Sequence, residues 1–150
     1  MNHDERPVLF CYDGSNEAHR AISAAAELLA PRRAVVLDVG PLLTPEQSYA
    51  EMFMPVIPDF PDDNAKAAFV RAKVGAEQAQ GAGFEAVAHA EVATPSWEGI
   101  VDYADEVDAA VIVIGSHGRH EGGELLHGSV SHKVAEHAHR PVLIVPPPRD

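Results

Sequence analysis

The sequence predicts a doubly wound α/β domain, in which a five-stranded parallel sheet is wound with four helices in the Rossmann-like manner. Strand-like and helix-like segments alternate along the 150 residues, which is the pattern of parallel strands joined by crossover helices. The chain shows no repeat, no low-complexity tract and no internal boundary, and its length suits one domain. We therefore predict a single domain over residues 1–150.

The expected strands are short apolar runs separated by helices or loops. In chain order they cover residues 8–12, 34–39, 84–92, 109–114 and 141–145. Three prolines at 146–148 cannot donate to a strand ladder, so they end the sheet. Residues 40–62 hold five of the twelve prolines, and we expect this stretch to be a surface excursion.

The first two helices are predicted from apolar residues that recur at helical spacing. One covers Glu17–Leu29, with Ser15 or Asn16 as its N-cap and Pro31 after its end. Its inner stripe is formed by Ala18, Ile22, Ala25 and Leu29. The next runs from residue 63 to about residue 80, where glycines follow.

The last two helices flank the fourth strand. Thr94 is the expected cap of the third helix, with Pro95 at its first helical position. The inner stripes of the two helices are Trp97, Val101 and Ala104, and Val130, Val134 and Ala138.

Charge and composition exclude several classes of partner. The formal net charge of −12 argues against nucleic acid and anionic membranes, because both require a basic face. One cysteine, Cys11, allows no internal disulfide and suits a reducing compartment. The N-terminus lacks the apolar core of a signal peptide, and no apolar run approaches the ~20 residues of a membrane helix. We expect a soluble cytoplasmic protein.

The most informative stretch joins the fourth strand to the last helix. It contains Gly115-Ser116-His117-Gly118, then nine residues, then Gly128-Ser129. Glycine permits positive φ and close approach of the backbone to a ligand, and a helix N-terminus presents N–H groups and partial positive charge. Together these features predict an anion cradle. The pattern is not a P-loop, because Ser129 stands where the lysine should be, and no G-x-G-x-x-G follows a predicted strand.

This constellation resembles the ATP-binding universal stress proteins, which carry G-x-x-G, nine residues and G-[S/T] at this place. The resemblance also includes Tyr12-Asp13-Gly14-Ser15 after the first strand and a closing segment at 140–146, and it covers about residues 6–146. It implies an ATP-binding regulatory protein of the stress response. Strands one and four are neighbours in that family, so both motifs would open into one crevice at the carboxyl ends of the strands.

The resemblance implies contacts to adenine near Asp38 and Val39, and contacts to phosphate from the glycine loop and the start of the last helix. For Asp13, a carboxylate at a strand exit, we expect bonds to ribose hydroxyls or a metal ion such as Mg²⁺; its alternative role is turn capping. The expected binding residues are Tyr12, Asp13, Gly14, Ser15, Asp38, Val39, Gly115, Ser116, His117, Gly118, Arg119, Gly128, Ser129, Val130 and Ser131.

The charge of the loop favours binding over catalysis. Arg119 and Lys133 are the only cations between 115 and 133, and Glu121 and Glu124 cancel them. Phosphoryl transfer requires concentrated positive charge, whereas this loop supplies mostly backbone dipoles. A slow ATPase or nucleotide hydrolase and a nucleotide-free interaction module are the alternatives.

Histidine and cysteine chemistry find little support. Six of the nine histidines fall between 117 and 139, but their spacing is not that of a metal site, and solvated histidines are expected instead. Cys11 lies in a strand, which raises the pKa of a thiol and disfavours a nucleophilic role. The resemblance also implies a homodimer through the last strand, limited by the prolines after it, and an unidentified protein partner.

Overall fold

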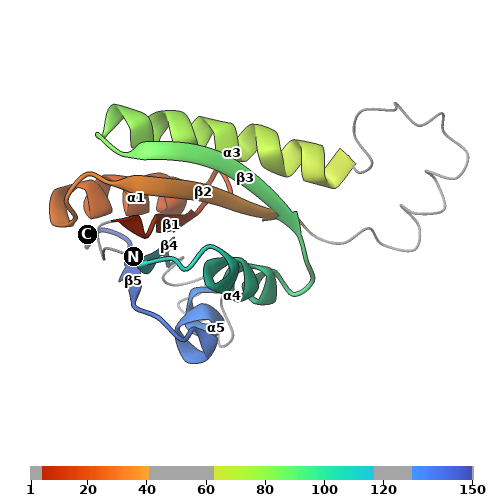
Figure 1. The fold of residues 1–150 in the computed structure, drawn as a ribbon. Helices are drawn as coiled ribbons and strands as arrows, with labels where there is room; N and C mark the ends of the chain where they lie inside the picture. Colours follow the sequence, from red (N-terminus) through yellow and green to blue (C-terminus); the bar gives the residue numbers. More distant parts are fainter. Residues whose placement is uncertain (1–4, 41–62, 117–129, 150) are drawn as a thin grey trace, which may run out of the picture.

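The computed structural model describes residues 5–40, 63–116 and 130–149, which form one parallel sheet covered by helices on both faces (Figure 1). The sheet has five strands in the order β3-β2-β1-β4-β5. The strands are β1 (Val8–Cys11), β2 (Arg33–Gly40), β3 (Glu85–Val92), β4 (Val111–Gly115) and β5 (Val142–Val145). The described helices are α1 (Asn16–Leu28), α3 (Asp63–Gly81), α4 (Ser96–Glu106) and α5 (Val130–His137). This architecture confirms the predicted fold class.

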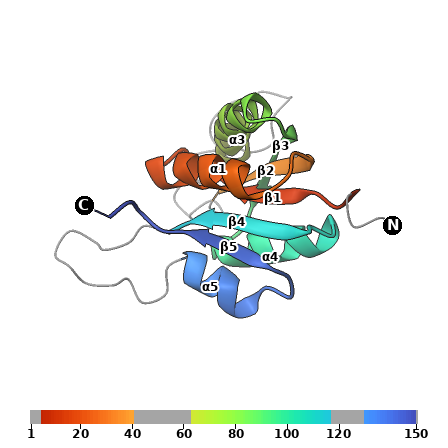
Figure 2. The same ribbon diagram turned by 90° about the vertical axis from the view of Figure 1, so that its left-hand side faces the viewer.

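Two helices lie on each side of the sheet. Figure 2 shows α1 and α3 on one face and α4 and α5 on the other. Alternate residues of β1 supply the two cores: Phe10 packs with α1 and α3, and Leu9 packs with α4 and α5. Phe10 meets Phe84 edge-on, with ring centroids 5.2 Å apart. Both faces of the central strands are therefore buried, which explains their continuous apolar runs.

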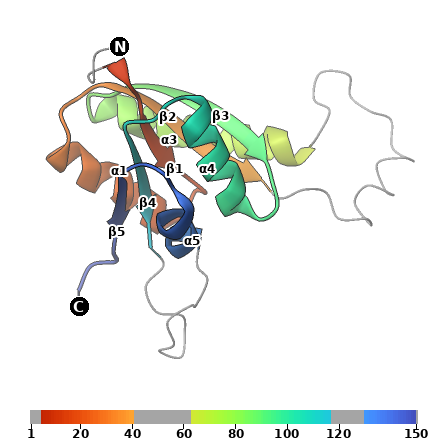
Figure 3. The ribbon, with the colours of Figure 1, turned by 60° about the horizontal axis from the view of Figure 1, so that its bottom comes forward.

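The chain order reverses at β1. From β1 the chain proceeds outward through β2 and β3, then crosses to β4 on the other side of β1 and continues to β5. The pairing of Phe10 with Val113 confirms that strands one and four are neighbours (Figure 3). A crevice is expected where the carboxyl ends of β1 and β4 diverge, because crossover connections leave on opposite faces there.

Most predicted boundaries of helices and strands lie within two residues of the observed ones. The N-terminal caps of two helices illustrate where the prediction and the structure agree and where they differ. The prediction that Ser15 caps α1 is confirmed, because its hydroxyl accepts from the Ala18 N–H at 3.2 Å. The prediction for α4 was wrong by one position: Pro95 is the N-cap residue with extended backbone, and the helix begins at Ser96. Ala138 lies just beyond α5, where its N–H still donates to Val134 O at 2.8 Å.

The predicted surface excursion lies outside the described residues except for Gly40, which ends β2. Among the described helices, none has the length and apolar character that a membrane crossing requires.

Candidate functional site

A crevice of about 110 Å³ opens at the carboxyl end of the sheet, at the point where β1 and β4 diverge. Its wall comes from the ends of β1, β2 and β4 and from the first turns of α1, α4 and α5. The lining residues are Cys11, Tyr12, Asp13, Ser15, Glu17, Ala18, Leu37, Asp38, Val39, Ser96, Ile100, Ile114, Gly115, Val130 and Ser131.

The structure brings together eight of the residues predicted from the sequence: Tyr12, Asp13, Ser15, Asp38, Val39, Gly115, Val130 and Ser131. Gly14 lies in the same turn, and Ser116 follows β4, but neither lines the crevice. Five further predictions, for His117, Gly118, Arg119, Gly128 and Ser129, lie outside the described residues.

The turn after β1 is held by its own side chains. Asp13 Oδ1 accepts from the Ser15 N–H at 2.9 Å, and Gly14 takes a φ of 81°, a conformation that favours glycine. Asp13 therefore fulfils the capping role that was its alternative interpretation. Its side chain is nevertheless exposed at the crevice, where a carboxylate can accept from hydroxyls or bind a hydrated cation.

The end of β2 presents backbone groups to the crevice. β1 and β2 pair up to Cys11 and Leu37, and the Tyr12 N–H then donates to Leu37 O at 2.9 Å. Because alternate residues of a strand direct both backbone groups to the same side, Val39 presents its N–H and C=O on the side of Leu37. β1 has already turned away at this level. A donor and an acceptor on one residue suit a planar heterocycle that carries the complementary pair.

Gly115 lines the crevice as the last residue of β4. It does not use the positive φ that glycine permits, because only Gly14 and Gly83 do so among the described glycines. A Cβ on Gly115 would lie 2.6 Å from Glu17 O and 2.8 Å from Glu17 C. The missing side chain therefore lets the first turn of α1 pack directly against the end of β4.

Asp38 is the most buried charged residue of the wall, with 1% exposure. Its carboxylate accepts two bonds from Arg71 on α3, at 2.7 Å from Nε and 3.1 Å from Nη2. Burial raises the pKa of the Asp38 carboxyl, and Arg71 opposes part of that rise. Asp38 therefore lines the crevice as part of β2, while its carboxylate accepts hydrogen bonds from a side chain of α3.

Tyr12 is tied to the helices on its face of the sheet. His19 Nδ1 lies 2.6 Å from Gln78 Oε1, an acceptor, so this nitrogen donates; in the neutral ring Nε2 then accepts from the Tyr12 hydroxyl at 2.9 Å. Burial and the nearby carboxylates of Asp13 and Asp38 raise the pKa of Tyr12. The phenol is thus a neutral structural group at neutral pH.

Several lining residues were not predicted from the sequence. Glu17 and Ser96 occupy first turns of helices, where acidic residues and serine are ordinary, so no signal separated them from capping residues. Cys11 lines the crevice floor, and burial with the charge of Asp13 raises its pKa to about 12. That value agrees with the predicted lack of nucleophilic character.

Metal binding by Asp13 remains a prediction. In the parts of the chain that the structure covers, no three His, Cys, Asp or Glu side chains are grouped to hold an ion. Two of the clustered histidines have other contacts: His137 stacks on Trp97 with centroids 4.4 Å apart, and His139 lies 3.9 Å from Asp105.

Fold and crevice together define a doubly wound α/β protein with a crevice at its topological switch point. The sequence matches the model of the universal stress protein family over residues 5–146. The chain belongs to the universal stress protein family. A search of curated proteins found no match.

Solved structures show the same fold. A universal stress protein from Archaeoglobus fulgidus is 27% identical with a TM-score of 0.69, covering 93% of this chain and 98% of that one. The same organism's universal stress protein in complex with dAMP is 26% identical with a TM-score of 0.64, covering 95% and 98%. A universal stress protein in complex with cAMP is 23% identical with a TM-score of 0.71, covering 95% and 97%.

Proposed function

We propose that this protein binds ATP in the β1/β4 crevice and acts as a regulatory component of a stress response. One observation carries the proposal: the Asp13 turn, the backbone of Val39 and the start of α5 at Val130 converge on one opening. The Archaeoglobus fulgidus relative in complex with dAMP supports an adenine nucleotide as the ligand.

The described crevice suits the nucleoside part of the ligand. Ligand pockets usually measure about 300–1,000 Å³. The crevice measures about 110 Å³, so we assign to it only part of the nucleotide. The base would bond to the N–H and C=O of Val39, and the ribose hydroxyls to Asp13. β4 ends at Gly115 and α5 begins at Val130, and both residues line the crevice. The described residues on either side of 117–129 therefore both lie at the crevice, where we place the phosphates.

Charge favours a metal-bound nucleotide. Three carboxylates, on Asp13, Glu17 and Asp38, line the crevice, and the described lining includes no lysine or arginine. A triphosphate beside these carboxylates requires a counter-ion; Asp13 would hold Mg²⁺, which would supply positive charge to the phosphates. The N-terminus of α5 adds a favourable term of about 0.3–2 kcal/mol for an anion.

Binding without rapid turnover is the activity that this wall supports. Efficient phosphoryl transfer requires a positioned base or water and cationic groups that stabilise the transition state. The carboxylates of the described wall concentrate charge of the opposite sign. We therefore propose a nucleotide-responsive regulator that acts in the cytoplasm on a protein partner.

A homodimer through β5 is part of the proposal. β5 is an edge strand, and Ile144 on it is 38% exposed, which is high for a large apolar residue in a sheet. Edge strands present unpaired backbone groups that a second copy can pair with. The prolines from Pro146 onward would restrict such pairing to the length of β5.

Isothermal titration with Mg-ATP and with AMP tests the proposed function. We expect saturable heats that disappear in Gly118→Val and Gly128→Val, because a side chain there would obstruct the phosphates. Gly81→Val is the matched control, since a Cβ at Gly81 meets nothing within 4 Å. Unchanged heats in both loop variants, or no heat with the unaltered protein, would contradict the proposal.

A further inference from the structure

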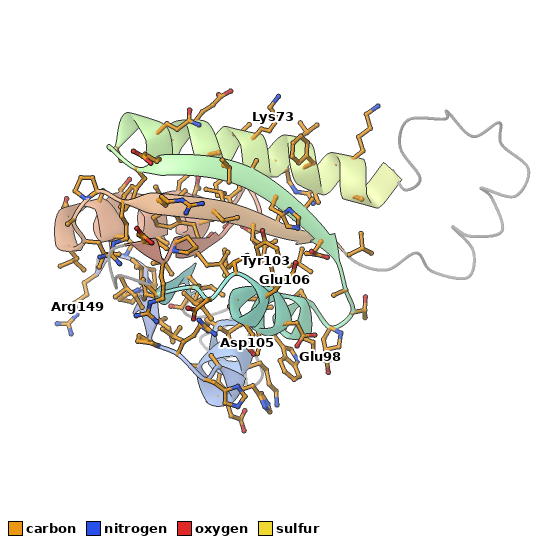
Figure 4. All side chains as sticks on the ribbon, viewed as in Figure 1. Lys73, Glu98, Tyr103, Asp105, Glu106 and Arg149 are labelled. Carbon is orange, nitrogen blue, oxygen red and sulfur yellow. The ribbon has the colours of Figure 1, made fainter. Side chains whose placement is uncertain are left out.

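Helix α3 packs closely against β2 and against Tyr12, which follows β1. Its buried face consists of small residues: Ala68, Ala72, Gly75, Ala76 and Ala79. A Cβ added to Gly75 would lie 2.8 Å from Val36 Cγ1 and 2.9 Å from the ring of Tyr12. Figure 4 shows Lys73 on the opposite, outward side of the helix. The small inward face brings the backbone of α3 within reach of the crevice wall.

Arg71 uses this proximity to contact both the end of β2 and the turn after β1. Its guanidinium donates to both oxygens of Asp38, at the end of β2. Its Cδ lies 3.5 Å from the position that a Cβ on Gly14 would take, so its aliphatic part covers the turn after β1. The Arg71 side chain is 41% exposed, whereas that of Asp38 is 2% exposed. The planar two-point bond fixes the orientation of the carboxylate as well as its charge.

We propose that Arg71 is a positioning residue of the nucleotide site, which holds Asp38 and with it the backbone of Val39 in the geometry that accepts the base. The inference rests on the proposed function, because Arg71 acts on a ligand only through Asp38 and the β2 end. No role in contacting the nucleotide is assigned to it.

The charges around Asp38 explain why the pair matters for binding. Arg71 approaches from α3, and Asp13 and the Tyr12 phenol approach from the end of β1, with His19 of α1 behind Tyr12. β3 contributes Ala90 opposite Asp38, an uncharged neighbour. Without Arg71, the carboxylates of Asp13 and Asp38 would face the same ligand with no counter-ion from α3. Burial would then favour the protonated carboxyl of Asp38 as the pH is lowered, whereas at high pH the ionised carboxylate would turn toward water and displace Val39.

The test compares Arg71→Met with Lys73→Gln, which removes the same charge from the same helix on its outward side. We expect the Kd for Mg-ATP and for AMP to rise about tenfold in Arg71→Met at pH 8, within the usual range of energetic coupling between sites. The difference should shrink when the pH is lowered to 5.5, because burial without Arg71 favours the protonated carboxyl of Asp38. Lys73→Gln should bind as the unaltered protein does at both pH values.

The double variant Arg71→Met/Asp38→Asn provides the rescue. Because no carboxylate is then left without its partner, we expect the pH dependence of the Kd seen in Arg71→Met to disappear in the double variant, and its Kd at pH 8 to lie between those of Arg71→Met and the unaltered protein. Arg71→Lys keeps a charge but not the planar fork, so an intermediate Kd is expected. It also serves as the test if Arg71→Met does not fold.

Each outcome decides between explanations. A lowered thermal midpoint in Arg71→Met with unchanged Kd at both pH values would overturn the inference and leave Arg71 as a stabilising residue only. Weakened binding that is independent of pH and is not rescued by Asp38→Asn would overturn it as well. If the unaltered protein bound neither Mg-ATP nor AMP, the proposed function itself would fail, which is a distinguishable result.

Discussion

The substitution Gly115→Ala probes the contact between the end of β4 and the first turn of α1. The new methyl would lie 2.6 Å from Glu17 O and 2.8 Å from Glu17 C, both backbone atoms. Ordinary contacts of carbon lie at about 3.5–4.0 Å, so roughly 1 Å must be gained by movement. A flexible side chain cannot absorb that movement, because the obstruction is the main chain of α1.

The loss in the free energy of unfolding can be estimated from the overpacking of this close contact. Inserting a methylene group where the surroundings cannot yield typically costs about 1–3 kcal/mol. For a chain of this size that corresponds to a fall in Tm of roughly 2–12 °C. Displacement of the first turn also weakens the bond from the Ala18 N–H to Ser15 Oγ, now 3.2 Å long. We therefore expect Gly115→Ala to lower both stability and nucleotide affinity.

Urea unfolding followed by circular dichroism measures the effect, with Gly81→Ala as the matched control. Gly81 ends α3 in open space, so alanine there should leave the free energy of unfolding unchanged or raise it by up to about 1 kcal/mol. If Gly115→Ala were as stable as the unaltered protein, the close approach of α1 to β4 would not exist as described. A stability loss equal in both variants would point to a general glycine effect and would refute the packing argument.

Three further predictions concern the elements around the crevice. Ser15→Ala should cost about 1 kcal/mol of unfolding free energy, because the Ala18 N–H loses its cap, and Ser15→Asp should largely restore it. Phe10→Ala should cost about 3–5 kcal/mol, since Phe10 is fully buried against Phe84, and a loss below about 1 kcal/mol would contradict that packing. The pKa of Cys11 is raised from 9.0 to about 12, so the folded protein holds the thiol proton more tightly than the unfolded chain. Stability should therefore fall as pH rises from about 9 toward 12, and Cys11→Ser should flatten that slope. Thiol reagents should modify Cys11 of the folded protein at pH 8 more slowly than the thiol of the unfolded chain.

The fold could be predicted almost entirely from the sequence because its determinants are local. Alternating apolar segments fix strands and helices, and a strand order with β1 beside β4 follows from crossover rules together with the family resemblance. The exact start of α4 could not be predicted. Proline is compatible with both the cap and the first helical position, and the choice of Ser96 as the start depends on the backbone conformation of Pro95.

The candidate site was predicted where it is encoded in a motif and missed where it depends on packing. Asp13 follows β1 and Gly115 ends β4, both within recognisable sequence motifs, and both line the crevice. Arg71 gave no signal, because its partner Asp38 lies 33 residues earlier and a helix arginine ordinarily faces solvent. The contact depends on Gly75 and the alanine face of α3, whose small residues carry little hydrophobic periodicity.

The same limit explains why the packing contact of Gly115 was not predicted. A sequence pattern can identify a position at which a Cβ would clash, but it does not identify the atom with which the Cβ would clash. Here the neighbouring atom is Glu17 O, contributed by a helix that follows a different strand. Only the three-dimensional arrangement separates close approach of a ligand from close approach of the chain itself.

A crystal structure of the protein grown with Mg-ATP tests the central claim most directly. The base should lie against the Val39 N–H and C=O, the ribose at Asp13, and the phosphates between Gly115 and the first turn of α5. Arg71 should still hold Asp38 in that complex. Density for the nucleotide at any other surface, with this crevice unchanged, would contradict the claim that the ends of β1, β2 and β4 form the binding site.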